Sequence, residues 1–250
     1  MALNLKPDRN AAGVLVTIEG GDGSGKSTHV KFLAQLLEKI GLEVVCVREP
    51  GGTLLGEQLR SIVLDPSNEG MSDRAELLIY EAARAQLVDE VIKPALARGA
   101  VVICDRFTDS TIVYQGYGRG IDITVIEALN DFATSGITPD ITIVFKCPDA
   151  EEEKDRVGRR GSLDRLESAG DDFHKRVFDG FNDISMSTDS RIRLIETSGL
   201  HSQTAKQVFE ALGSLLPFLI DDSIDFTEDL KAYDAEHDHS KDEQCDGDGE

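Results

Sequence analysis

Short apolar runs alternate along the chain with longer segments whose apolar residues recur at helical spacing. Five of the runs are apolar at nearly successive positions, which is typical of strands that are covered on both faces. These runs are Val14–Glu19, Glu43–Arg48, Ala100–Asp105, Asp140–Cys147 and Arg191–Glu196. Helices are predicted at Lys26–Ile40, Leu54–Leu64, Arg74–Arg98, Ile123–Ser135, Asp171–Met186 and Thr204–Phe218. The alternation predicts an α/β fold, with a five-stranded parallel sheet and helices on both of its faces.

Two segments fall outside this pattern. Asp149–Glu167 is dense in charge and contains a Gly-Arg-Arg-Gly stretch, so we expect a mobile excursion from the domain. Asp221–Glu250 is acidic and poor in large apolar residues, and we expect most of it to be disordered. Leu230 and Tyr233 are compatible with a short helical contact, but this pattern is too brief to predict a helix.

Composition adds a strong acidic charge to this picture. The chain has 250 residues, 47 acidic and 26 basic, and a formal charge of −21. Residues 221–250 hold 13 acidic and two basic residues, so this tail carries −11 of the total. The length and the 40% hydrophobic content suit one domain, residues 14–220, preceded by an extension, residues 1–13. The acidity argues against nucleic acid and against an anionic membrane as partners.

The cysteines and the amino terminus indicate the compartment. Cys46, Cys104 and Cys147 each lie in an apolar run, and no Cys-x-x-Cys pair occurs. We expect these three thiols to be buried as small hydrophobic groups in a reducing environment. Residues 1–13 lack the long apolar stretch of a secretory signal. No apolar run approaches the ~20 residues of a spanning helix. The sequence therefore predicts a cytoplasmic protein.

A phosphate-binding loop is predicted between the first strand and the first helix. Its sequence fits the motif Gly-x-x-x-x-Gly-Lys-Ser/Thr, and the strand and helix around it are the context that this motif requires. Glycines allow backbone N–H groups to turn toward phosphate oxygens, and the helix amino end adds a partial positive charge. A lysine reaches the β and γ phosphates, and a hydroxyl ligates Mg²⁺. The residues are Gly20, Gly21, Asp22, Gly23, Ser24, Gly25, Lys26 and Ser27, followed by Thr28.

A second group of polar residues follows the third predicted strand. Asp105 ends this apolar strand and Arg106 comes next. Active groups in parallel sheets gather at the carboxyl ends of strands. Alone, Asp105 suits a simple turn or cap, but beside a phosphate-binding loop it is placed to hold magnesium-bound water. A nucleoside triphosphate and Mg²⁺ are therefore the predicted ligands.

Further motifs narrow the class of phosphate-binding protein. A GTPase switch would carry an Asn-Lys-x-Asp motif, which is absent, and a helicase or transport ATPase needs more chain. A small kinase remains, and four motifs together resemble those of bacterial thymidylate kinase (dTMP kinase). They are Gly20–Thr28, Arg48–Thr53 (Arg-Glu-Pro-Gly-Gly-Thr), Asp105–Thr111 and Tyr114–Gly120. The resemblance covers about residues 14–215, and the second and fourth motifs are specific to it.

The resemblance implies a fold, a reaction and a partner. The implied fold is the three-layer kinase fold around a phosphate-binding loop, with a small lid at about residues 149–167. The implied reaction transfers the γ-phosphoryl group of ATP to dTMP, with Mg²⁺, and the implied assembly is a homodimer. The acceptor phosphate is already a nucleophile, so the protein needs to align two polyanions and offset their charge rather than supply a base.

The acceptor phosphate site is assigned by the same resemblance. Arg106 matches the arginine that grips the acceptor phosphate, a bidentate task that suits a guanidinium group. Arg48 lies in a segment expected beside this site, although a surface arginine at a strand end is an equal alternative. Pro50 matches a proline that can follow a cis peptide bond. Asp22 matches a carboxylate near the acceptor sugar and phosphate.

The thymine pocket is expected on the helix that holds Tyr80 and Arg84, which share one face at i and i+4. Arg84 would donate to the thymine O4 and so disfavour cytosine, which presents a donor there. The family usually has phenylalanine at the position of Tyr80; tyrosine can stack on a base as well, or be an ordinary core residue. The other residues matched to the base and sugar are Ser110, Thr111, Tyr114 and Gln115, with Tyr114 placed to exclude a 2′-hydroxyl.

The lid is expected to close over the ATP phosphates. Arg156 and Arg160 align with lid arginines of the family, and Arg159 is displaced by one from a third. A solvated charged helix is the alternative for this segment. Asp164 and Glu167 match acidic residues on the acceptor side. We expect the adenine near Thr197 and Ser198, after the last strand.

Three other readings stay open at this point. A deoxynucleoside kinase, another nucleoside monophosphate kinase and a nucleotide-binding module without turnover share the phosphate-binding loop. Activity toward dTMP and other acceptors would separate them. We also expect deletion of residues 225–250 to leave catalysis nearly intact.

Overall fold

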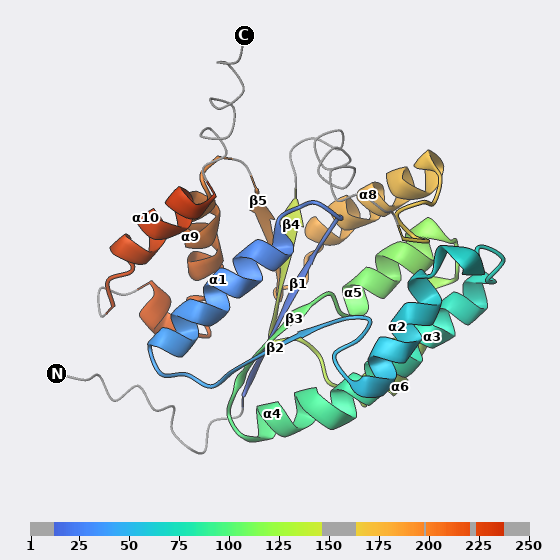
Figure 1. Ribbon diagram of the computed structural model, residues 1–250, viewed down its shortest axis with the longest axis horizontal. Coiled ribbons are helices and arrows are strands. Elements are labelled where there is room, and N and C mark those ends of the chain that lie inside the picture. Colours follow the sequence, from blue (N-terminus) through green and yellow to red (C-terminus); the bar gives the residue numbers. More distant parts are fainter. Residues whose placement is uncertain (1–12, 147–163, 198, 221–223, 238–250) are drawn as a thin grey trace, which may run out of the picture.

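The computed structural model describes residues 13–146, 164–197, 199–220 and 224–237. Its centre is one parallel sheet of five strands in the order β2-β3-β1-β4-β5, which confirms the predicted fold class. The strands are β1 (Val14–Gly20), β2 (Val44–Arg48), β3 (Val101–Asp105), β4 (Ile141–Lys146) and β5 (Ile192–Glu196). The helix α1 (Lys26–Lys39) follows β1 directly, as the phosphate-binding loop requires. Figure 1 shows helices on both sides of this sheet.

The remaining helices connect the strands in chain order. Two of them run on through π-helical turns, at Val88–Ile92 after α3 and at Ile112–Gly118 after α5. Among the described residues, no helix combines the length and the apolar character needed to cross a membrane. The helices are α2 (Leu54–Leu64), α3 (Asp73–Leu87), α4 (Lys93–Ala97), α5 (Thr108–Thr111), α6 (Ile123–Thr134), α8 (Asp171–Ser185), α9 (His201–Leu212) and α10 (Thr227–Glu236).

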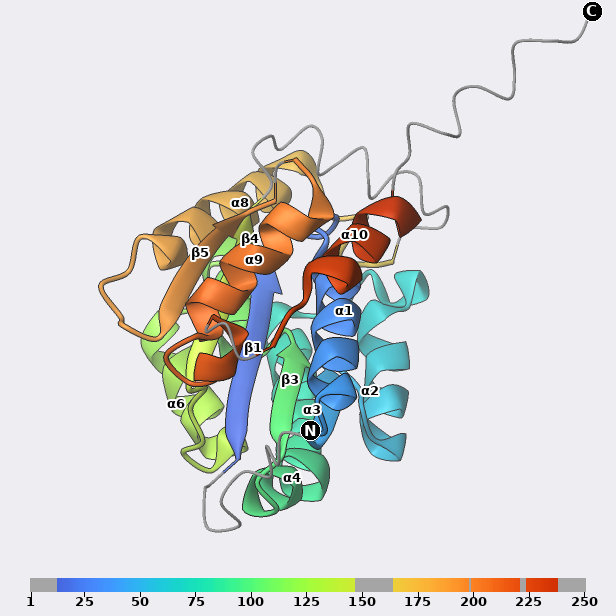
Figure 2. The same ribbon diagram turned by 90° about the vertical axis from the view of Figure 1, so that its left-hand side faces the viewer.

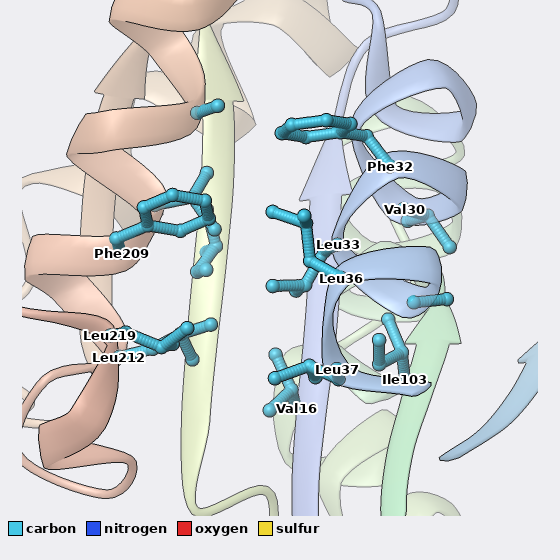
Figure 3. Packing of buried hydrophobic residues seen from close by; sticks show 14 of the residues in the cluster. Val16, Val30, Phe32, Leu33, Leu36, Leu37, Ile103, Phe209, Leu212 and Leu219 are labelled. Atoms are coloured by element: carbon cyan, nitrogen blue, oxygen red, sulfur yellow. The ribbon is translucent and has the colours of Figure 1, made fainter. Parts of the chain in front are cut away.

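One face of the sheet is covered by α1 and α9. Alternate strand residues point to this face, because successive side chains of a strand face opposite ways. Figure 3 shows α1 and α9 directing apolar side chains toward each other here, with Leu36 and Leu37 on α1 and Phe209 and Leu212 on α9. Leu37 and Leu212 are fully buried, and each such side chain stabilises the fold by roughly 2 kcal/mol.

The opposite face is covered by α3, α4 and α8. Leu15, Val102 and Cys104 point to it and pack against the end of α3 and the π-helical turn that follows. Nearer β4, Val144 packs with Phe173 of α8 and the segment after α5. The two faces together bury the inner strands β1, β3 and β4 on both sides, which explains their continuous apolar character, whereas the edge strands β2 and β5 stay partly exposed.

The acidic tail contains a folded element. The expectation of disorder for residues 221–250 is wrong for residues 227–236, which form α10. Leu230 and Tyr233 of this helix are 9% and 3% exposed and belong to the core that α1 and α9 form. Figure 2 shows α10 beside α1 and α9. The apolar spacing in the sequence was too short to reveal the helix because it buries only two of its own residues. Residues 238–250 lie outside the described residues.

One expectation about the cysteines is also wrong. Cys104 is buried in β3, an inner strand of the sheet, as expected. Cys46 is exposed, because β2 is the edge strand of the sheet. Cys147 lies outside the described residues.

A buried histidine joins α1 to α10. His29 is 6% exposed, and its ring stacks on Phe145 of β4 with a centroid distance of 5.2 Å. Its Nδ1 lies 2.8 Å from the Tyr233 hydroxyl oxygen. Burial, together with the neighbouring His201 and His237, lowers the pKa of His29 to about 3. His29 is therefore neutral in the folded protein at physiological pH.

This histidine gives the fold a dependence on pH. An unfolded histidine has a pKa of about 6.5, so below that pH the unfolded chain binds a proton that the folded chain refuses. We expect His29 alone to lower the free energy of unfolding by roughly 1 kcal/mol between pH 7.5 and pH 5.5. Urea unfolding of the wild type and of His29→Phe at both pH values measures this. The variant should lose less stability on acidification, and equal losses in both proteins would contradict the assignment.

Candidate functional site

The loop between β1 and α1 has the backbone that the motif predicts. Gly20, Gly23 and Gly25 have φ angles of 131°, 87° and 89°, which favour glycine. A Cβ atom at Gly20 would lie 2.2 Å from the carbonyl oxygen of Phe145, so another residue would collide with β4 there. The predicted loop residues Gly20, Gly21, Asp22, Gly23, Ser24, Gly25, Lys26, Ser27 and Thr28 are contiguous around the amino end of α1.

The lysine of the motif lies across the loop. Its Nζ donates hydrogen bonds to the carbonyl oxygens of Gly20 at 2.9 Å and Gly21 at 2.5 Å. The side chain is 6% exposed, so its charge sits among backbone dipoles rather than in bulk water. Lys26 is therefore fixed where a phosphate chain in the loop would lie.

The two predicted metal ligands meet at the carboxyl ends of neighbouring strands. The Ser27 hydroxyl donates to Asp105 Oδ2 at 3.0 Å. Among the described residues, no group of three or more His, Cys, Asp or Glu side chains could enclose a metal ion. Mg²⁺ commonly takes one or two protein oxygens together with water and phosphate oxygens, so this hydroxyl and carboxylate pair fits Mg²⁺.

Arg106 joins the phosphate-binding loop to the turn after β3. Its guanidinium donates to Gly20 O at 3.0 Å and to Asp22 Oδ1 at 2.6 Å. The Tyr114 hydroxyl donates to the other oxygen, Asp22 Oδ2, at 3.0 Å, and the guanidinium lies 5.0 Å from the Tyr114 ring centre. Burial alone would raise the pKa of Asp22, but Arg106 and Lys26 hold it well below its usual value. Asp22 is therefore a charged anchor for both groups.

A buried glutamate at the end of β1 holds the backbone of this turn. Arg106 has a φ of 69°, a left-handed conformation that costs energy for a residue with a side chain. Glu19 is fully buried and accepts the N–H of Phe107 at 2.7 Å and the hydroxyl of Ser110 at 2.5 Å. Burial, with the neighbouring Asp109, raises the pKa of Glu19 to about 7. Its contacts to Phe107 and Ser110, which follow Arg106, compensate the strain at Arg106.

A pocket of about 550 Å³, counted to its open mouth, lies beside this arginine. Ten of the predicted substrate residues line it: Asp22, Pro50, Tyr80, Arg84, Arg106, Ser110, Thr111, Tyr114, Gln115 and Asp164. Five further lining residues were not predicted: Glu49, Arg60, Leu64, Phe107 and Leu166. Glu49 lies in the motif Arg48–Thr53 and Phe107 in the motif Asp105–Thr111. Arg60, Leu64 and Leu166 lie outside the motifs, and their spacing in the sequence indicates only helical or apolar positions.

Arg84 is 1% exposed and is held by acidic neighbours. Its Nε donates to Glu49 at 2.8 Å and its Nη1 to Glu81 at 2.9 Å, while other N–H groups reach Asn130 and the Phe107 carbonyl. Burial raises the pKa of Glu49 to about 7 although Arg84 opposes the shift. Glu49 Oε1 and Glu81 Oε2 are the buried side-chain oxygens without a partner among the described residues. The Arg84 guanidinium, which is predicted to bind the thymine O4, thus donates its hydrogen bonds mainly to other groups of the protein.

Other predicted residues lie around the pocket. Arg48 is half exposed, pairs with Glu57 at 2.9 Å and is not among the lining residues. The peptide bond before Pro50 is cis. Glu167 accepts the backbone N–H of Asp164 at 2.9 Å and shapes the turn that presents Asp164 to the pocket. Arg156, Arg159 and Arg160, the arginines of the predicted lid, lie outside the described residues, as does Ser198 near the predicted adenine position.

Comparisons with known proteins agree on one family. The sequence model described as thymidylate kinase matches residues 18–208. A thymidylate kinase of an Exiguobacterium species (strain AT1b) is 46% identical over 185 residues, covering 74% of this chain and 87% of that protein. One of Pseudomonas fluorescens (strain Pf-5) is 44% identical, covering 84% and 97%. The crystal structure of thymidylate kinase from Ehrlichia chaffeensis is 36% identical with a TM-score of 0.66, covering 80% and 99%.

The buried ion pairs of Arg84 give a stability prediction. Replacing Arg84 by alanine would leave Glu49 and Glu81 buried without their cation, so we expect Arg84→Ala to lower the free energy of unfolding by about 3 kcal/mol. The exposed pair Arg98–Glu43, at 3.0 Å, is the matched control, and Arg98→Ala should cost less than about 1 kcal/mol. Urea titration measures both, and equal losses would contradict the structural role of Arg84.

Proposed function

This chain belongs to the thymidylate kinase family, and from that premise we propose that it phosphorylates dTMP with ATP, giving dTDP and ADP for dTTP synthesis. The observation that carries the proposal is the position of Arg106. Its guanidinium contacts the phosphate-binding loop at Gly20 and also lines the neighbouring pocket. A phosphate donor in the loop and a phosphate acceptor in the pocket would both lie beside this one cation.

We propose that the charges of the loop and turn align the two phosphate groups. Arg106 would bind the acceptor phosphate, and Lys26 would hold the β and γ phosphates of ATP. An acceptor phosphate entering the site would compete with Asp22 for the Arg106 guanidinium, now 2.6 Å from Asp22. Asp22 would then be free to accept a hydrogen bond from the deoxyribose 3′-hydroxyl. Catalysis on this scheme needs alignment and charge compensation, not a general base.

The pocket has the parts of a thymine site. Tyr80 lines it and presents a ring on which a base can stack. Tyr114 lines the same cavity with its hydroxyl tied to Asp22, so it would fill the space that a ribose 2′-hydroxyl needs. We propose that Arg84 recognises the thymine O4, for which one N–H group must leave its present protein acceptor. Gln115, Thr111 and Ser110 complete the side chains near the base and sugar in this proposal.

We propose that Ser27 and Asp105 hold Mg²⁺, which would offset charge on the transferred phosphoryl group. The Ser27 hydroxyl oxygen lies 3.0 Å from Asp105 Oδ2, and both side chains offer only oxygen atoms as metal ligands. We further propose that Arg156, Arg159 and Arg160 close over the ATP phosphates as the lid. Asp164 and Glu167 would lie at the base of that lid, on the side that faces the acceptor dTMP.

We also propose a homodimer that uses an exposed apolar face. The face is defined by Leu54, Leu78 and Phe132, which are 82%, 56% and 83% exposed. They lie on α2, α3 and α6, which pack side by side (Figure 1). Exposed apolar patches of this kind mark association surfaces. The net charge of −21 supports the proposal that nucleic acid is not a partner, and the substrates ATP and dTMP favour a cytoplasmic location.

A panel of acceptors tests the proposed reaction. ADP release should be faster with dTMP than with dCMP, because the pocket is expected to present a donor to O4 and cytosine carries an amino group there. It should also be faster than with dGMP, whose base is larger, and dUMP, which keeps O4 but lacks the methyl group, shows how much that group contributes. Preference for dCMP or dGMP would overturn the proposal. Phosphorylation of thymidine but not dTMP would indicate a deoxynucleoside kinase, and ATP binding without transfer would indicate a regulatory module.

Arg106 should carry a large share of the rate. We expect Arg106→Ala to lower kcat/KM for dTMP by roughly three decades, because the variant loses the cation between donor and acceptor. The dissociation constant of ATP should change much less, since Lys26 and the loop backbone remain. Steady-state kinetics and ATP titration separate these effects. Arg98→Ala, on an exposed pair, is the control, and unchanged kinetics in Arg106→Ala would refute the role.

A further inference from the structure

The carboxyl-terminal helix lies outside the part of the chain that the family model matches. That match ends at residue 208, and α10 spans Thr227–Glu236. The relatives described above are covered over 87–99% of their own lengths but cover at most 84% of this chain. The helix therefore adds to a domain that is otherwise shared with those relatives. The contacts of α10 show whether it is connected to the phosphate-binding loop.

The helix is fastened to α1 and to the start of α9. The Tyr233 ring stacks on Phe32 of α1, with centroids 3.9 Å apart and an interplanar angle of 2°. Lys39, at the end of α1, pairs with Asp229 at 2.5 Å. Asp234 Oδ1 accepts the N–H of Ser202 at 2.7 Å, in the first turn of α9. These contacts tie the tail helix to the helix that begins with the phosphate-binding lysine.

One buried contact leads from α10 to the phosphate-binding loop itself. The Tyr233 hydroxyl and His29 Nδ1 are 2.8 Å apart. A Cβ atom built on Gly25 would be in van der Waals contact with the His29 ring, 3.8 Å from Cδ2, so this ring borders the last glycine of the loop. On its other side the ring stacks on Phe145, which pairs with Gly20 in the sheet. His29 thus lies next to Gly25 at the end of the loop. It also contacts Phe145, the strand residue that pairs with Gly20 at the start of the loop.

From these contacts we propose that Tyr233 is a positioning residue for the ATP site. It holds the His29 ring, and the ring holds the loop in the conformation that accepts the ATP phosphates. The physical reason is that a buried ring nitrogen without a partner is costly, so His29 would turn to find another one. A small displacement of a preorganised phosphate site weakens binding of its ligand. The proposal rests on the proposed function only in that the loop binds ATP.

On this proposal the tail helix contributes to ATP binding, whereas the sequence alone predicted that deletion of residues 225–250 leaves catalysis nearly intact. Residues 225–250 include Asp229, Tyr233 and Asp234, which make the polar contacts to α1 and α9 described above. The dTMP pocket is lined by residues of other elements and includes none from α10. The tail helix should therefore affect the donor nucleotide and not the acceptor.

Tyr233→Phe in the full-length protein tests the proposal. The variant keeps the ring on Phe32 and loses only the hydroxyl that meets His29. We expect the ATP dissociation constant and the KM for ATP to rise about fivefold. The KM for dTMP should stay within about twofold, because general destabilisation would not select one substrate. Lys231→Ala, on the exposed side of α10, is the control and should change neither constant.

A double-mutant cycle tests the route through the histidine. His29→Phe keeps an aromatic ring beside Phe145 but has no nitrogen for Tyr233, so adding Tyr233→Phe to it should cause little further change in ATP binding. Additive effects would overturn the route through His29. Unchanged ATP binding in Tyr233→Phe, or equal loss for both substrates, would overturn the proposal. A wild type that binds ATP without phosphorylating dTMP would refute the proposed function, while the ATP titrations would still decide the role of Tyr233.

Discussion

The ion pair between Arg106 and Asp22 is the interaction on which the site depends. The two residues are 84 positions apart and meet only because β1 and β3 are neighbouring parallel strands that end at the same edge. The guanidinium reaches Asp22 from a residue in a left-handed backbone conformation. That conformation persists because Glu19, buried at the end of β1, accepts hydrogen bonds from the turn on which Arg106 lies. Strain at one residue is thus balanced by a buried acceptor at another, a pattern that is common at functional sites.

The cluster around Arg84 also fixes a defined geometry at a cost in stability. Burying a guanidinium with Glu49 and Glu81 costs desolvation that the ion pairs repay only in part, so an apolar replacement of the whole cluster would not need to be less stable. What the cluster provides is a fixed wall for the pocket, with polar groups at defined places. Two of its carboxylate oxygens, Glu49 Oε1 and Glu81 Oε2, are buried without a partner among the described residues.

The acidity of the chain is compatible with binding two polyanions because the cations are concentrated. Lys26, Arg84 and Arg106 gather at the loop and the pocket, while much of the negative charge belongs to the tail. Exposed charges more than about 8 Å away are largely screened at physiological salt. The tail is nevertheless not a separate appendage, since α10 packs against α1 and extends the core of the sheet's first face. The acidic segment thus combines a packed helix, which supports the domain, with residues 238–250 beyond it.

The sequence by itself determined the sheet, most of the helices around it and the phosphate-binding loop, but not α5 with the π-helical turn that follows it. These depend on local signals: apolar runs of strand length, glycines where φ is positive, and a lysine and serine at fixed spacing. The family resemblance also identified ten of the fifteen pocket residues: seven lie within the four short motifs, and Tyr80, Arg84 and Asp164 were matched outside them. Tertiary structure alone decided the rest. Arg60 and Leu166 reach the pocket from segments whose spacing shows only helical or apolar character, and Arg84 turned out to be shared among four protein partners. The helix α10 was not predicted because its stability also depends on distant residues. It is stabilised by contacts with Phe32 and His29, some 200 residues away in the sequence, and its own apolar periodicity is weak.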